Sequence, residues 1–157
     1  MKSDIHMSKK ICVPSVLLVA VLSLYGCAAT GPQFEAVSAS LPPISGKNSR
    51  LFFYREYAAF GSGMRPDIFV CNKKVGQSVP GGAFYVDLPA GECNVTIPAI
   101  LYPGQEDLRV DMGPRGVKYV RTWMGGSSFG GRTNMELVPE ATAINALQGL
   151  AFTTAGN

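Results

Sequence analysis

The run that decides the fold of this chain reads Leu51-Phe52-Phe53-Tyr54-Arg55-Glu56-Tyr57. Aromatic side chains favour β-strands because they pack well on a pleated, half-buried surface. Neighbouring side chains in a strand point to opposite faces, and Leu51, Phe52 and Phe53 make both faces apolar at the start of the run. We therefore expect a strand over 51–57 that lies at the centre of a sheet.

Further short runs of strand-forming residues follow, each bounded by Gly, Pro or Asn. Alternation within them is regular, as in 93–97, where Cys93, Val95 and Ile97 share one face. Besides 51–57, we expect strands at 67–71, 75–79, 83–88, 93–97, 108–112, 117–124 and 135–138.

A short helix is expected to end the domain over 139–149. Pro139 suits a first helical turn, Ile144 and Leu147 share a face at a spacing of three, and Gly149 can end the helix. Residues 50–150 thus predict an all-β domain, a small antiparallel β-sandwich or open barrel of about 7–8 short strands with a short C-terminal helix. Residues 151–157 are expected to be a C-terminal tail.

Residues 1–26 have the parts of a bacterial export signal. Lys2, Lys9 and Lys10 make a positive start, and an apolar run follows over 11–25. A membrane-spanning helix needs about 20 apolar residues, so this shorter run favours a signal that is removed, with an uncleaved signal anchor as the alternative.

The apolar run ends in Leu24-Tyr25-Gly26-Cys27. This box resembles the lipobox of bacterial lipoproteins, with a bulky Tyr25 where a small residue is usual. The resemblance implies that the chain is cut before Cys27, that the thiol carries a diacylglycerol and that the new amine is acylated. Several acyl chains make a stable membrane anchor where one would be marginal. Because Ala28 and Ala29 follow without an Asp, we expect the inner leaflet of the outer membrane, facing the periplasm.

Small and polar residues with several prolines occupy the next stretch. We expect residues 27–49 to be the lipidated N-terminus and a flexible tether of roughly 25–30 Å. In the alternative, the apolar residues Phe34, Val37 and Leu41 dock on the domain.

Five blocks of the domain share their order and spacing with a known family. They are Phe53-Tyr54-Arg55, Ile68-Phe69-Val70-Cys71-Asn72-Lys73-Lys74-Val75-Gly76, Gly82-Ala83-Phe84-Tyr85, Leu88-Pro89-Ala90-Gly91 and Gly116-Val117-Lys118-Tyr119-Val120-Arg121. Together they resemble the bacterial lipoprotein family catalogued as domain of unknown function 2846, over about residues 51–150. The family usually has Asp-Gly at the first turn and Pro-Gly before a His, where this chain has Asn72-Lys73-Lys74 and Pro89-Ala90-Gly91-Glu92-Cys93. The resemblance implies an all-β lipoprotein domain and supplies no activity.

The composition argues against a nucleic-acid partner and a histidine-based site. The formal charge is +3, but three lysines and one aspartate lie in residues 1–26, and the remainder is nearly neutral. Nucleic-acid binding depends on clustered Lys and Arg at phosphates. His6, the only histidine, also lies in the signal, which removes the base of a Ser-His-Asp or Cys-His site and the ligands of a histidine-rich metal site. We expect no catalytic residue, metal or cofactor.

Two of the four cysteines are available for a disulfide. Cys12 leaves with the signal and Cys27 carries lipid, so Cys71 and Cys93 remain in an oxidising compartment. Alternation turns both of them inward. A bridge between them would stabilise the fold by about 3 kcal/mol, and two buried thiols that pack as small hydrophobic groups are the alternative.

The glycine-rich stretch 125–134 is expected to be a loop before the last strand. Its backbone and Arg132 suit an anion, although the strand, Lys and helix of a P-loop are missing. A hairpin loop with Phe129 tucked onto the sheet is the alternative.

Tyr85, Tyr119 and Trp123 complete this speculative ligand site as a sugar-stacking surface. The same alternation makes them equally suitable as core residues or cross-strand pairs.

Carboxylates are the remaining basis for catalysis. Two pairs have the residue types of a general acid and base: Asp67 with Asp87, and Asp111 with Glu136. In the alternative they are ordinary surface groups, because they lie at strand ends or outward positions.

The sequence thus favours a non-enzymatic, membrane-anchored β domain that binds an envelope protein or glycan, or supports envelope structure, through a sheet edge or loops. The alternatives are a small-molecule or glycan binder that uses the aromatic residues and 125–134, and a hydrolase that uses carboxylates alone.

Overall fold

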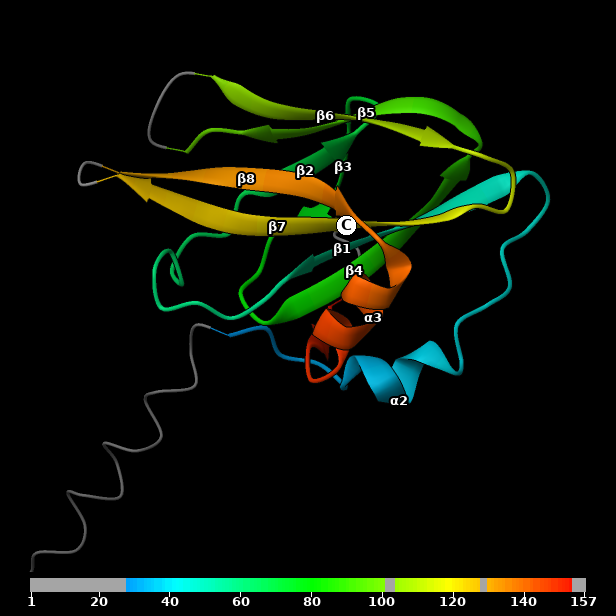
Figure 1. Ribbon diagram of the computed structural model, residues 1–157, viewed down its shortest axis with the longest axis horizontal. Helices are drawn as coiled ribbons and strands as arrows, with labels where there is room; N and C mark the ends of the chain where they lie inside the picture. The colour runs from blue at the N-terminus through cyan, green and yellow to red at the C-terminus, as the bar shows by residue number, and fades with distance from the viewer. Residues whose placement is uncertain (1–27, 101–103, 128–129, 154–157) are drawn as a thin grey trace, which may run out of the picture.

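The computed structural model describes residues 28–100, 104–127 and 130–153. They form two β-sheets packed face to face, with two short helices on the outer side of the larger sheet (Figure 1). The larger sheet has the order β8-β7-β1-β4-β9, and the smaller has β3-β2-β5-β6. The strands are β1 (Asn48–Arg55), β2 (Asp67–Val70), β3 (Lys73–Gln77), β4 (Gly82–Pro89), β5 (Gly91–Pro98), β6 (Gln105–Met112), β7 (Val117–Ser127), β8 (Gly130–Val138) and β9 (Ala151–Phe152). The helices are α2 (Phe34–Ser38) and α3 (Glu140–Leu147).

β1 is the central strand that the aromatic run predicts. β4 lies antiparallel on one side and β7 parallel on the other, with Phe53 opposite Phe84 in β4 and Val120 in β7. Every residue over 49–55 is buried. A strand buried on both faces needs a layer of structure on each side.

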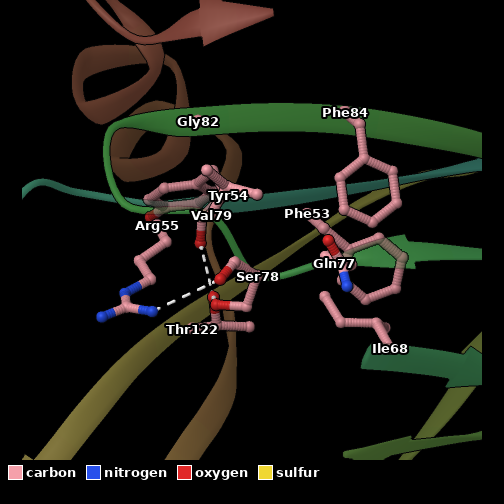
Figure 2. A pocket seen from close by; sticks show the side chains of 10 residues that line it. All are labelled: Phe53, Tyr54, Arg55, Ile68, Gln77, Ser78, Val79, Gly82, Phe84 and Thr122. Carbon is pink, nitrogen blue, oxygen red and sulfur yellow. Dashed lines mark hydrogen bonds between the residues drawn. The ribbon is translucent and has the colours of Figure 1, made fainter. Parts of the chain in front are cut away.

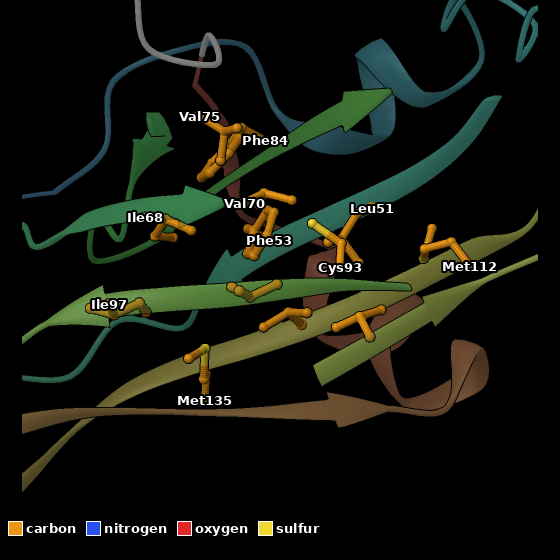
Figure 3. Packing of buried hydrophobic residues seen from close by; sticks show 13 residues of the cluster. Leu51, Phe53, Ile68, Val70, Val75, Phe84, Cys93, Ile97, Met112 and Met135 are labelled. Carbon is orange, nitrogen blue, oxygen red and sulfur yellow. The ribbon is translucent and has the colours of Figure 1, made fainter. Parts of the chain in front are cut away.

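The side chains of β1 alternate between two cores. Leu51 and Phe53 point into the space between the sheets, whereas Phe52 and Tyr54 point toward the helices. The inter-sheet core consists of Leu51, Phe53, Ile68, Val70, Val75, Phe84, Cys93, Val95, Ile97, Val110, Met112, Val120 and Met135 (Figure 3). The outer core, between the larger sheet and the helices, consists of Phe34, Phe52, Tyr54, Ala83, Tyr119, Ala143, Leu147 and Leu150.

The expected small β-sandwich with a short C-terminal helix is confirmed, with nine strands among the described residues. The larger sheet is mixed rather than antiparallel, since β7 runs parallel to β1 and β9 parallel to β4. Alternation assigns a side chain to a face but does not fix the direction of the neighbouring strand. That direction follows from the connection of residues 113–116, which carries the chain from the smaller sheet to the larger.

Helix α3 packs on the outer core through Ala143 and Leu147, which are fully buried. The expected pairing of Ile144 with Leu147 is wrong, because Ile144 is 37% exposed. Residues three and four apart both share a helix face, and contact with the sheet selects the spacing of four. Gly149 follows the helix with a φ of 81° and ends it as expected. In the three described ranges, no helix has the length and apolarity needed to cross a membrane.

The N-terminal segment lies on the domain. The amide of Ala29 donates to the carbonyl of Pro80 (2.9 Å), and the amide of Phe34 donates to that of Leu150 (2.8 Å). Phe34 is 5% exposed, and Leu41 packs against the outer core. Phe34 and Leu41 therefore dock on the domain, as the alternative predicts, and this part of the chain is not a free tether.

The other end of the domain extends the larger sheet where a tail was expected. β9 pairs with the start of β4, with Gly82 opposite Ala151. The amide of Phe152 donates to the carbonyl of Pro32 (2.7 Å). Two residues are too few to give a strand pattern in the sequence. This strand is therefore recognised only from its hydrogen bonds to neighbouring segments.

Truncating Leu147 and Ile144 separately tests which face of α3 is buried. Leu147→Ala is expected to lower the free energy of unfolding by about 2–5 kcal/mol, because it leaves a cavity in the outer core. Ile144→Ala should change it by less than about 1 kcal/mol. Urea unfolding followed by circular dichroism measures both, and similar losses in the two variants would contradict this packing.

Candidate functional site

A buried arginine holds one end of the sandwich together. Arg55 ends β1 and is 1% exposed. Its guanidinium donates to the carbonyl oxygens of Gly61 (2.8 Å), Met64 (2.9 Å) and Ser78 (3.3 Å). The first two carbonyls belong to residues 56–66, which connect β1 to β2 and which we call the 56–66 loop. Arg55 therefore fixes this loop against the body of the domain.

Backbone carbonyls, rather than a carboxylate, accept these hydrogen bonds from the Arg55 charge. Burial lowers the pKa of the Arg55 guanidinium, a group that nevertheless stays protonated in proteins. Its Nε has no hydrogen-bond partner in the part of the chain that the structure describes. The sequence signal for this burial is alternation, which puts Arg55 on the face of Leu51 and Phe53.

Two buried hydroxyls lie beside Arg55 (Figure 2). The oxygens of Ser78 and Thr122 are 2.8 Å apart, and the Thr122 hydroxyl donates to the carbonyl of Tyr54 (3.2 Å). The space that these residues enclose is too small to admit a water molecule. A serine becomes a nucleophile through an adjacent base, and the residues that line this space contain no histidine or carboxylate. The cluster is suited to holding the fold rather than to catalysis.

The stretch 125–134, expected to be a loop, is mostly paired strand at the end of the β7–β8 hairpin, which agrees with the hairpin alternative. β7 and β8 remain paired beyond Trp123, with Gly125 opposite Arg132 and Gly126 opposite Gly131. The loop was predicted too long because glycine is a weak strand former, whereas here glycine leaves space for a neighbouring side chain. A Cβ on Gly126 would lie 2.6 Å from the ring of Phe60 in the 56–66 loop.

The 56–66 loop presents two aromatic rings to solvent. Tyr57 is 62% exposed and Phe60 is 51% exposed. Below them the loop is closely packed, since a Cβ on Gly61 would lie 2.4 Å from the side chain of Met124. Gly61 also has a φ of 71°, a conformation that favours glycine. The rings are therefore held on a fixed support.

Two residues of the expected aromatic site, Tyr85 and Tyr119, meet at Phe52. Tyr119 stacks on Phe52 with ring centres 5.2 Å apart, and the Tyr85 ring centre is 5.7 Å from that of Phe52. Arg50 lies over the Tyr85 ring at 4.2 Å. Burial, with a smaller effect of the nearby Glu140, raises the pKa of Tyr119. Both tyrosines thus take the core and cross-strand positions that the sequence left open.

Trp123 and Arg132 lie farther along the same hairpin. Trp123 is four residues beyond Tyr119 on β7, which corresponds to about 13 Å, and Arg121 lies 5.6 Å from its ring centre. Arg132 is exposed and its guanidinium approaches Gly104. The structure therefore brings Tyr85 and Tyr119 together but spreads the others along the hairpin. Phe129 lies outside the described residues.

Three of the four carboxylates considered for catalysis are bound to cations. Asp87 accepts two hydrogen bonds of 2.7 Å from Arg50, and Glu136 lies 3.5 Å from a guanidinium nitrogen of Arg121. Asp67 accepts from Lys74 and Gln77, and these hydrogen bonds, Lys74 first, lower its pKa.

The fourth, Asp111, is exposed on β6 opposite Glu92. In the ranges that the structure describes, no three His, Cys, Asp or Glu side chains gather as a metal site requires.

A disulfide joins Cys71 to Cys93, whose Cα atoms are 5.4 Å apart. Cys93 is buried on β5 as expected, but Cys71 is exposed in the turn between β2 and β3. That turn contains Cys71 and Asn72, both with positive φ, one residue earlier than predicted. The bridge therefore ties a turn to the neighbouring strand at the end of the sandwich opposite Arg55.

Comparison with family models, with curated proteins and with solved structures finds no match for this chain. The lipidation residue predicted from the sequence, Cys27, lies outside the described residues and directly precedes the first of them.

Replacing Arg55 tests its hold on the 56–66 loop. Arg55→Met should lower the free energy of unfolding by about 3 kcal/mol, because three carbonyls lose a charged donor, and should expose Tyr57 and Phe60 to chymotrypsin. Limited proteolysis with mass spectrometry measures the cleavage rate. Arg109→Met, at a residue whose side chain is 81% exposed, is the control, and equal cleavage of the two variants would rule out this role.

The disulfide is testable by its effect on stability. The double variant Cys71→Ala/Cys93→Ala should be less stable by about 3 kcal/mol in urea unfolding, because the bridge restricts the unfolded chain. Reduced wild-type protein should match the variant. Two reactive thiols from these cysteines in denatured, unreduced protein would contradict the bridge.

Proposed function

We propose that this chain is an exported, lipid-anchored protein of a bacterial envelope whose β-sandwich binds a partner or supports envelope structure without catalysing a reaction. The proposal places it with the family catalogued as domain of unknown function 2846. The observation that carries it is the Cys71–Cys93 disulfide in a chain whose first 27 residues have the pattern of an export signal and lipobox. Structural disulfides persist in oxidising compartments, so the bridge and the signal favour the same side of the membrane.

The non-enzymatic part of the proposal is supported by how the polar groups are used. Arg55 donates to the carbonyl of Ser78, and the hydroxyls of Ser78 and Thr122 hydrogen-bond to each other. Asp87 accepts a hydrogen bond from Arg50. A catalytic acid or base needs access to a substrate proton, and these groups are committed to internal contacts.

The loops suit a contact surface better than the edges of the smaller sheet do. β3 exposes Lys73 and Lys74 at one edge of the smaller sheet, and β6 exposes Asp107, Arg109 and Asp111 at the other. Charged side chains on edge strands oppose the addition of a further strand. We therefore assign partner binding to the ends of the sandwich, with an envelope protein as the first candidate partner.

A small-molecule or glycan ligand is the second candidate. It is favoured by a hollow of about 290 Å³ between α2 and α3 that Phe52 and Tyr119 line. Co-sedimentation with peptidoglycan supports this candidate, and crosslinking to a specific envelope protein supports the first.

Replacing Cys27 tests the anchor. Cys27→Ser should remove acyl labelling and shift the protein from the membrane to the soluble fraction, because acyl chains supply the attachment. Cell fractionation and acyl-chain labelling measure the change, with Cys12→Ser in the signal as the control. Continued acyl labelling of Cys27→Ser would overturn the proposed lipidation, and attachment to the outer membrane is read from the density of the fraction.

A further inference from the structure

We propose that the end of the sandwich formed by the 56–66 loop and the β3–β4 turn lies on the phospholipid surface, with Tyr57 and Phe60 inserted among the headgroups. This inference rests on the proposed function, because it takes the anchor to be at residue 27. It assigns a second membrane contact, made by the folded domain itself.

The first support is the place where the chain enters the domain. The amide of Ala29 donates to the carbonyl of Pro80 (2.9 Å), so the chain is tied to the β3–β4 turn two residues after position 27. A Cβ on Gly82 would lie 2.9 Å from the Cβ of Ala29, which shows how closely the segment is seated. Two residues span at most about 7 Å. A lipid on Cys27 would therefore hold this end of the domain against the bilayer.

The second support is the position of Tyr57 beside the same turn. The amide of Gly81 donates to the carbonyl of Arg55 (2.9 Å), and a Cβ on Gly81 would lie 4.0 Å from the Cβ of Tyr57. The chain entry and the 56–66 loop are thus neighbours, as Figure 1 also shows. Tyr57 is therefore an exposed aromatic side chain close to the point where the chain enters the domain.

The third support is the distribution of exposed apolar side chains. Tyr57 (62%), Phe60 (51%) and Ile100 (50%) have the largest exposures among the large hydrophobic residues described, and all three lie at this end. Val117, which is 40% exposed, lies at the start of β7 at the opposite end. Aromatic residues with a polar tip, such as tyrosine, are enriched at membrane interfaces.

The fourth support is the fixed shape of the loop. Arg55 binds the carbonyls of Gly61 and Met64, and Phe60 lies on the hairpin at Gly126. Because these contacts already order the loop, insertion does not have to order it again. The one acidic residue of the loop, Glu56, is paired with Arg121 (2.9 Å).

Two aromatic rings are enough for this contact because the lipid supplies most of the attachment. A covalent tether of a few residues gives the rings an effective concentration at the bilayer on the order of millimolar. At this concentration even a weak contact between the rings and the bilayer forms, and this contact sets the orientation of the domain.

Depth-dependent fluorescence quenching tests the proposal. Trp123 is the only tryptophan, so Trp123→Phe gives a dark background in which Phe60→Trp reports at the loop. The lipidated protein, which begins at Cys27, is placed in vesicles of phosphatidylethanolamine and phosphatidylglycerol with brominated acyl chains. We expect emission from position 60 to fall at least about twofold, since interfacial side chains lie about 5–10 Å into the headgroup region. The matched control, Val117→Trp in the same background, should keep its emission.

The outcomes separate the two proposals. Lipidated protein that sediments with the vesicles while position 60 stays unquenched overturns the membrane contact and leaves the anchor standing. Equal quenching at positions 60 and 117 also overturns it, because the domain would then have no fixed orientation. Protein that carries no acyl chain and does not sediment overturns both. Because Phe60 packs on the hairpin, Tyr57→Trp serves as a second probe position, with circular dichroism to confirm the fold of each variant.

Discussion

The burial of β1 on both faces is the constraint on which the rest of the structure depends. Phe53 needs a layer on one side of the strand and Phe52 needs a layer on the other. The smaller sheet supplies the first layer. The second is assembled from α3 and from the two ends of the domain, where Phe34 packs against Phe52 with ring centres 5.8 Å apart. Full burial of such a side chain is worth about 1.5–3 kcal/mol, so segments that look like connectors become part of the core.

Local alternation predicts those parts of the fold whose strands have one buried and one exposed face. In β5, Cys93 and Val95 are buried while Asn94 between them is exposed, and the sequence carries this pattern directly. Prediction from alternation fails where a contact between residues far apart in the sequence decides the structure. Gly126 belongs to a strand because Phe60, far earlier in the chain, lies against it. The sequence around either residue does not predict this contact. The same holds for β9, which is defined by Gly82 and Pro32 rather than by its own residues.

The candidate site was predictable to a similar extent. Elimination of Cys12 and Cys27 left one pairing for a disulfide, and the pairing is confirmed, although Cys71 faces solvent from a turn that begins one residue early. Tyr119 and Trp123 have equivalent patterns in the sequence, yet Tyr119 is 5% exposed below the helices while Trp123 is only half-buried beyond them. The difference comes from where α3 ends over the sheet, which an alternating pattern does not encode.

The two ends of the sandwich are held in different ways, and this bears on how the proposed module works. The end near the chain entry is held by the hydrogen bonds of Arg55, and on our proposal it faces the bilayer. The opposite end then faces the compartment and carries a hollow of about 480 Å³ that the disulfide borders, together with Lys73, Asp87 and Glu92. The Cys71–Cys93 disulfide cross-links the turn beside this hollow to β5. A partner bound there would meet a surface of mixed charge, held at a set distance from the membrane by the rings at the other end.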